Sequence, residues 1–65
     1  MKYQATVHFY SNEDGTHLGE ERYEVEADDE PMAKRIASEM SEESVYDDPR
    51  VDIYRQIRVT EKISA

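Results

Sequence analysis

The start of the chain alternates between apolar and polar side chains. Between Lys2 and Tyr10, one parity is held by apolar or aromatic residues and the other by polar or amphipathic ones. A period of two, with β-branched and aromatic residues on one side, is typical of a half-buried strand. The segment therefore predicts a strand whose inward side chains are Tyr3, Ala5, Val7 and Phe9.

A turn and a second strand follow. Residues Ser11 to Gly19 supply turn chemistry, and Asp14-Gly15 is the predicted tight point because glycine tolerates positive φ. Alternation resumes from Glu20 to Ala27, and Thr16 to Leu18 is an alternative beginning of this strand. The two alternating segments predict a β-hairpin, with Tyr23, Val25 and Ala27 also directed inward.

The sequence Asp28-Asp29-Glu30-Pro31 is typical of a helix start. Aspartate accepts hydrogen bonds from the free N–H groups of a first turn, and proline has no N–H to lose there. Asp29 is the preferred N-cap and Asp28 the alternative. An apolar stripe at helical spacing predicts a helix that ends near Glu43, the stripe being Ala33, Ile36, Ala37 and Met40, widened by Met32.

A loop from Ser44 to Arg50, which contains Pro49, leads to a third strand from Val51 to Lys62. Arg55 interrupts the apolar parity of this strand. Either a β-bulge shifts the register there, or Arg55 lies where the helix does not cover the sheet. We expect Ile63 to Ala65 to be frayed.

The predicted order ββαβ indicates a single α+β domain over residues 1–65. A right-handed strand–helix–strand crossover favours a three-stranded antiparallel sheet of order 2-1-3, with the helix packed on one face and the other face open. The predicted core consists of Tyr3, Ala5, Val7, Phe9, Tyr23, Val25, Ile36, Ala37, Met40, Val51, Ile53, Ile57 and Val59.

Charge is the strongest feature of the composition. Sixteen Asp and Glu residues face eight Lys and Arg residues, so the net charge is −8 in a chain of 65 residues. This charge disfavours direct binding to nucleic acid or to an anionic membrane and favours a basic partner, although high charge also serves solubility. The chain has no cysteine, and no apolar run approaches the roughly 20 residues of a membrane span or forms a signal peptide. We expect a cytoplasmic protein.

The acidic residues are concentrated in one stretch. Residues Asn12 to Glu30 contain nine carboxylates and one arginine. Acidic side chains two residues apart on one strand face are separated by roughly 6.6 Å. Duplex DNA carries one phosphate per roughly 3.4 Å of helix axis on each strand, so the two spacings are on the same scale. The basic residues are expected to gather apart, around the third strand. The predicted partner-binding residues are Glu20, Glu24, Glu26, Asp28, Asp29 and Glu30, with Asp47 and Asp48 secondary.

The open sheet face gives a second hypothesis. Tyrosine and arginine are frequent in interface hot spots, but tyrosine is also simply a good strand residue. The protein would then be a small adaptor or a homodimeric module that uses an edge strand or this face, with His8, Tyr10, Tyr54, Gln56 and Arg58.

Two histidines are the remaining candidates for site chemistry. His8 and His17 would bind zinc only if the hairpin brought them together, and their spacing matches no ligand pattern. We therefore interpret them as two exposed histidines and predict no metal, no cofactor and no enzymatic activity.

The segment Tyr23-Glu24-Val25-Glu26-Ala27-Asp28, followed by a helix with Ala33 and Ala37, resembles a strand-to-helix junction of small phage and plasmid accessory proteins. Size, acidity, lack of cysteine and the ββαβ order together resemble the small phage-encoded anti-CRISPR proteins, several of which act as DNA mimics. The resemblance implies a non-enzymatic inhibitor. Its partner would be a basic nucleic-acid-binding protein such as a CRISPR effector, at the DNA-binding surface that reads the PAM.

Overall fold

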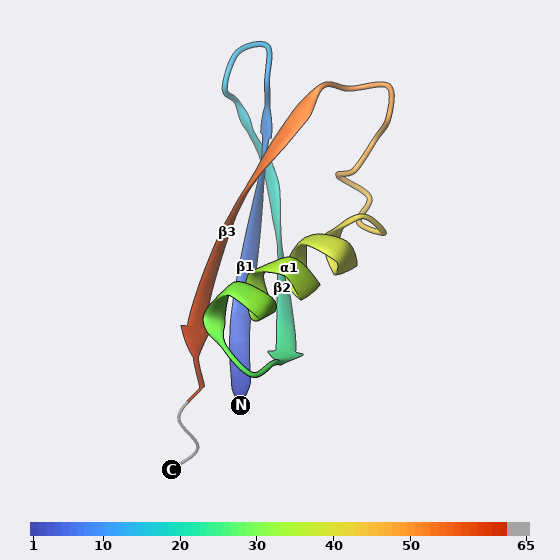
Figure 1. Cartoon of the computed structure of the whole chain (residues 1–65). Coiled ribbons are helices and arrows are strands. Elements are labelled where there is room, and N and C mark those ends of the chain that lie inside the picture. Colours follow the sequence, from blue (N-terminus) through green and yellow to red (C-terminus); the bar gives the residue numbers. More distant parts are fainter. Residues whose placement is uncertain (63–65) are drawn as a thin grey trace.

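A computed structural model describes residues 1–62, so the expected fraying of Ile63 to Ala65 lies outside the described residues. The chain forms β1 (Lys2–Ser11), β2 (His17–Glu26), α1 (Glu30–Ser41) and β3 (Ile53–Glu61). The sheet has the order β2-β1-β3, and both pairings are antiparallel (Figure 1). The predicted α+β fold with a 2-1-3 sheet is confirmed.

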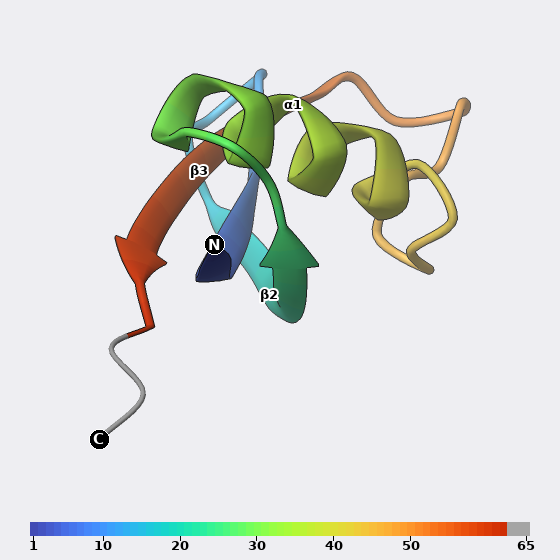
Figure 2. The ribbon, with the colours of Figure 1, turned by 60° about the horizontal axis from the view of Figure 1, so that its bottom comes forward.

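Helix α1 packs on one face of the sheet, and no helix covers the opposite face within residues 1–62 (Figure 2). The helix surface that meets the sheet is built from small residues four apart, Ala33, Ala37 and Ser41, all completely buried. Small side chains let the helix approach closely, so β1 supplies the bulk of the core. The buried apolar residues are Tyr3, Ala5, Val7, Phe9, Val25, Ala27, Ala33 and Ala37.

Two predicted core residues are exposed. Met40 is 40% exposed and Val51 is 44% exposed, so the prediction that they belong to the core is wrong. The helix rests on its Ala33–Ala37–Ser41 line, which leaves Met40 at the side of the contact. Ser41, which is not part of the predicted apolar stripe, is buried and donates its hydroxyl to the carbonyl of Ser38 at 2.7 Å. Val51 precedes β3, in the connection that follows the helix.

The element boundaries agree with the predicted ones to within three residues. Strand β2 begins at His17, as the alternative boundary anticipated, and α1 ends at Ser41 instead of near Glu43. Asp29 is the N-cap, with its carboxylate accepting the Met32 N–H at 2.9 Å. Gly15 has φ 75° in the hairpin turn, as expected from the turn chemistry there.

Arg55 lies in a regular stretch of the sheet. It is paired with Phe9, and the β1–β3 register runs without a shift from Tyr3 to Ser11, which excludes the bulge. Helix α1 crosses the half of the sheet nearer the N-terminus, and the connection from residue 42 to 52 runs along the other half (Figure 1). Arg55 therefore lies where α1 does not cover the sheet, with its guanidinium 5.4 Å from the Phe9 ring centroid.

Tyr46, from the same connection, closes this half of the core. Its ring centroid is 5.5 Å from that of Phe9, and its ring also lies directly against Gly19 of β2. The connection is fixed further by Ser44, whose side-chain oxygen accepts the Tyr46 N–H, and by Asp52, whose carbonyl accepts the Asn12 N–H. The residues after α1 thus extend the cover of the sheet toward the hairpin.

Candidate functional site

The strand-to-helix connection forms an exposed acidic surface. We call Glu26, Asp28, Asp29 and Glu30 the acidic junction. All four are exposed, and none forms an ion pair within residues 1–62. Two have local tasks, because Asp29 caps α1 and Glu30 lies in its first turn, where negative charge opposes the helix dipole. Four of the predicted partner-binding residues therefore lie within five consecutive positions and are all exposed.

The negative charge of this junction affects the pKa of Tyr3. Burial is the main cause that raises the pKa of the Tyr3 hydroxyl above 10.0, and the carboxylates of Glu61, Asp29 and Glu30 raise it further. Glu61, at the end of β3, therefore extends the negative surface from the junction toward the neighbouring strand end. Glu61 is not among the residues predicted for this surface.

Glu20 and Glu24 lie on the open face of β2, as predicted, but each has a basic neighbour. The Glu20 carboxylate is 3.7 Å from Arg22, and the Glu24 carboxylate is 3.5 Å from the Lys62 ammonium. Both pairs are well exposed, and exposed ion pairs contribute little and break readily. These two glutamates are partly neutralised at rest and remain accessible to a stronger cationic partner.

Asp47 and Asp48 are held by arginines in the connection after α1. Asp47 lies 2.8 Å from Arg55, with both side chains about one quarter exposed. Asp48 lies 3.1 Å from Arg50, and its hydrogen bonds to the Arg50 side chain and backbone lower its pKa below 3.8. The structure therefore gives both secondary candidates a local partner and places them outside the acidic junction.

The two signs of charge are less segregated than the sequence analysis expected. Five of the eight basic residues form ion pairs within residues 1–62, namely Arg22, Arg35, Arg50, Arg55 and Lys62. Strand neighbours and the folding back of the connection create these contacts. The acidic junction is the part of the predicted surface that forms no ion pair within residues 1–62, although Lys2 is the strand partner of Glu26.

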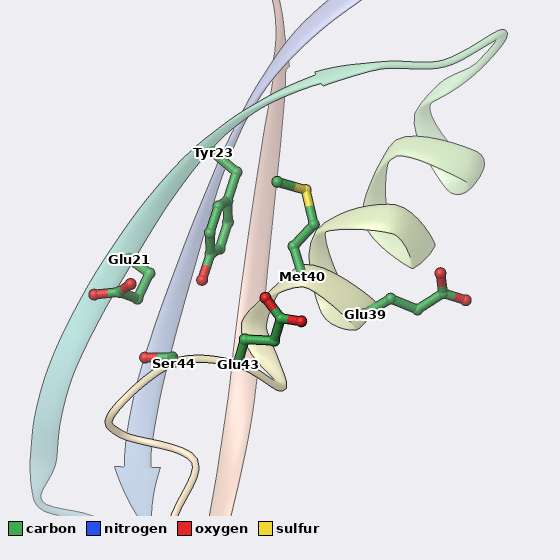
Figure 3. A pocket seen from close by; sticks show the side chains of 6 residues that line it. All are labelled: Glu21, Tyr23, Glu39, Met40, Glu43 and Ser44. Carbon is green, nitrogen blue, oxygen red and sulfur yellow. The ribbon is translucent and has the colours of Figure 1, made fainter.

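A groove between β2 and the end of α1 carries further carboxylates. It has a volume of about 430 Å³ and is lined by Glu21, Tyr23, Glu39, Met40, Glu43 and Ser44. Tyr23 and Met40 face each other across the groove, and Glu39 points away from them (Figure 3). Burial raises the pKa of Tyr23 above 10.0, followed by the charge of Glu21, with a smaller contribution from Glu43. This groove has no signal in the sequence, since it joins residues from β2, α1 and the connection after α1.

The open sheet face carries a cluster of rings at its hairpin end. We call His8, Tyr10, His17 and Tyr54 the aromatic face. Tyr10 and Tyr54 stack with centroids 5.2 Å apart and an interplanar angle of 17°. His17 lies 5.2 Å from Tyr10 and 5.3 Å from His8, measured between ring centroids. The structure thus brings together three residues of the predicted open-face patch and adds His17.

A shift in strand pairing explains the position of His17. Phe9 pairs with Gly19, but Tyr10 pairs with His17, which leaves Leu18 unopposed. Because side chains alternate along a strand, one extra residue transfers His17 from the core parity to the open face. The hairpin therefore does unite the two histidines, which the sequence spacing did not indicate.

Within residues 1–62, no three or more histidine, aspartate or glutamate side chains gather as ligands for one metal ion. No helix in the described part of the chain has the length and apolar character needed to cross a membrane. No protein-family model matches the sequence, and neither the curated proteins nor the solved structures contain a match to it.

Proposed function

We propose that this protein is a non-enzymatic inhibitor whose acidic surface takes the place of nucleic-acid phosphates in a basic site of a larger protein. The observation that supports this proposal best is the acidic junction. Its four carboxylates are adjacent, exposed and without an ion pair within residues 1–62, although five of the eight bases are paired elsewhere. Uncompensated charge of this kind is available to cations of a partner.

The shape of the molecule supports the same proposal. Its extents are 41 × 17 × 17 Å, so it is a rod with its strands along the long axis (Figure 1). Glu24 and Glu26 lie on one face of β2, about 6.6 Å apart along the strand. One DNA strand carries one phosphate per about 3.4 Å of helix axis, so the step from Glu24 to Glu26 corresponds to about two phosphates along the axis. The β2 edge and the junction therefore present negative charge on the length scale of a phosphate backbone.

The candidate partner is the nucleic-acid-binding surface of a CRISPR effector. Such effectors hold the guide–target duplex in a positively charged channel and read the PAM with arginine side chains. An acidic rod that enters this surface would exclude DNA without any chemical step. Glu20, Glu24, Glu26, Asp28, Asp29 and Glu30 are the proposed phosphate substitutes. Asp47 and Asp48 would contribute only after release from Arg55 and Arg50.

The experiment is a competition between this protein and labelled DNA for purified CRISPR effectors. The variant E26K/D28K reverses two junction charges that have no ion pair and do not cap the helix. The matched control E13K/E42K makes the same charge change at exposed positions near the hairpin turn and after α1.

We expect the parent and the control to displace DNA at low salt, and E26K/D28K to fail. Displacement should weaken steeply as salt rises, because screening acts on exposed charges. Equal displacement by E26K/D28K and the parent would exclude the junction as the mimic surface. Failure of the parent to displace DNA from every effector would exclude this class of partner.

The aromatic face supports a second candidate function, a small adaptor or homodimeric module. The stacked Tyr10 and Tyr54 rings and the 39% exposure of Tyr54 give the open sheet face an apolar area. In that case Y10A/Y54A should abolish association while E26K/D28K should not, and association should change little with salt. Sedimentation of both variants separates this function from the mimic.

A further inference from the structure

One side-chain contact on the open face joins two imidazoles. The Nδ1 atom of His8 and the Nε2 atom of His17 are 3.2 Å apart. Both rings belong to the aromatic face. They are held on adjacent strands, so the backbone fixes their separation. The shift in pairing at Leu18 is what turns His17 toward His8.

This separation suits two ligands of one metal ion. Imidazole nitrogen binds Zn²⁺ at about 2.0–2.1 Å, which places two nitrogens of a tetrahedral site about 3.3 Å apart. The rings already have nearly this spacing, and a rotation about the side-chain torsions would direct both lone pairs at one ion. Their exposed position permits that rotation.

We propose that His8 and His17 form a two-histidine site for a divalent transition metal such as Zn²⁺ or Cu²⁺. Imidazole suits these ions, whereas Mg²⁺ and Ca²⁺ require oxygen ligands. The two histidines occupy two coordination positions, and the others are open to water or to a group from a binding partner. The site lies apart from the acidic junction and does not depend on the proposed inhibition.

The neighbouring groups favour a cation. Glu20 is the strand partner of His8, and its carboxylate is on the same face, where it is 3.7 Å from Arg22. The net charge of −8 also draws cations toward the molecule. The same charge attracts cations without selectivity, so a test must distinguish imidazole ligands from carboxylates.

The test is a titration of the untagged protein with ZnCl₂, followed by the NMR signals of the histidine rings. We expect saturable shifts of the His8 and His17 ring signals, and no such shifts with CaCl₂ at the same concentrations. The variants H8A and H17A should each lose the site. The matched controls are E13A and D28A, which remove exposed carboxylates and should leave it unchanged.

Stability gives a second measurement. An ion that binds only the folded chain raises the unfolding midpoint, so Zn²⁺ should raise it in the parent but not in H8A or H17A. Zinc shifts that survive in both histidine variants, or that CaCl₂ reproduces, would show general binding to carboxylates and overturn the proposal. Absence of any zinc-induced shift would mean that His8 and His17 only form a hydrogen bond with each other, and it would also overturn the proposal.

Discussion

Gly19 shows how one residue position depends on a distant side chain. Any Cβ at this position would collide with the Tyr46 ring, which occupies the space beside the β2 backbone. Tyr46 in turn packs on Phe9, the largest completely buried side chain. The close approach of the Tyr46 ring, and not the φ angle, favours glycine here, because within residues 1–62 Gly15 alone has a positive φ.

The substitution G19A should therefore displace Tyr46 and expose part of Phe9. We expect a loss of about 1–3 kcal/mol in the free energy of unfolding, the usual cost of overpacking, measured by urea denaturation. The control is the pair Y46A and G19A/Y46A. Once the ring is absent the added methyl group has room, so the double variant should be no less stable than Y46A. Additive losses would contradict this contact.

At the same scale, His17 shows what the sequence could not predict, whereas Arg55 confirms one of the two alternatives predicted for it. Their parity places both on the core side of their strands. His17 changes side because Leu18 is unopposed, and Arg55 stays but meets Asp47 where α1 does not reach. The contact of Arg55 with Asp47 has no local signal, since it depends on how residues 42–52 fold back. The union of His8 with His17 depends instead on the shift in pairing at Leu18, which the alternation of the sequence does not reveal.

The start of helix α1 is set by local hydrogen bonds to its N-cap residue, Asp29. The Asp29 carboxylate accepts the Met32 N–H, and the Asp29 carbonyl accepts the Ala33 N–H, so this residue closes the first turn. We expect D29A to lower the free energy of unfolding by about 1 kcal/mol, the typical value of an N-cap. D28A removes an equal charge next to it and should change stability much less. Equal losses in urea denaturation would contradict the assigned cap.

Strand alternation, the turn and the helix start are local signals, and they correctly predicted the element order and the sheet topology. The side of α1 that meets the sheet was predicted less well. Hydrophobicity favoured Met40, whereas packing selected Ser41, because a small residue permits the closest approach between helix and sheet. A pattern of apolar residues predicts which broad side of a helix faces the sheet. The exact rotation of the helix about its axis is decided by how the surfaces of helix and sheet fit together.

The groove between β2 and α1 predicts how stability depends on alkaline pH. Burial and the charge of Glu21 raise the pKa of Tyr23 above 10.0 in the folded chain, so the neutral hydroxyl is favoured there. The unfolded chain releases this proton first. The contribution of Tyr23 to stability is therefore complete below pH 10.0 and is lost as pH rises through the folded pKa.

The unfolding midpoint of the parent should fall as pH rises above 10.0, and Y23F should show a shallower fall because phenylalanine has no proton to lose. Tyr3 also has a raised pKa, so its share of the alkaline loss of stability remains in Y23F. Y54F, which removes an exposed hydroxyl from the other face, is the matched control and should follow the parent. A pH profile of Y23F identical to that of the parent would contradict the role of the groove.

The whole molecule is a narrow body with a large negative charge. Composition alone predicted that a surface would be acidic, and the hairpin-to-helix stretch predicted where. Which carboxylates keep their charge could not be predicted, because pairs such as Glu24 with Lys62 join the two outer strands across β1. The structure thereby narrows the candidate surface from eight predicted residues to the acidic junction and the weakly paired glutamates of β2.

This charge distribution predicts opposite effects of salt on folding and on partner binding. A net charge of −8 within extents of 41 × 17 × 17 Å means that many carboxylates repel one another. The Debye length is about 10 Å at 0.1 M salt and about 3 Å at 1 M, so NaCl weakens this repulsion. NaCl also weakens the exposed ion pairs, but each of these contributes little to stability. The unfolding midpoint should therefore rise with NaCl.

Binding to a basic partner should weaken over the same range, since screening reduces the attraction between the junction and its cations. The two measurements use one protein and one salt series, so a general change in the fold cannot produce both trends. E26K/D28K has less self-repulsion, and its midpoint should rise less with NaCl than that of the parent. A midpoint that falls with NaCl would mean that the ion pairs outweigh the repulsion. The acidic surface would then be a structural network, with less charge available to a partner.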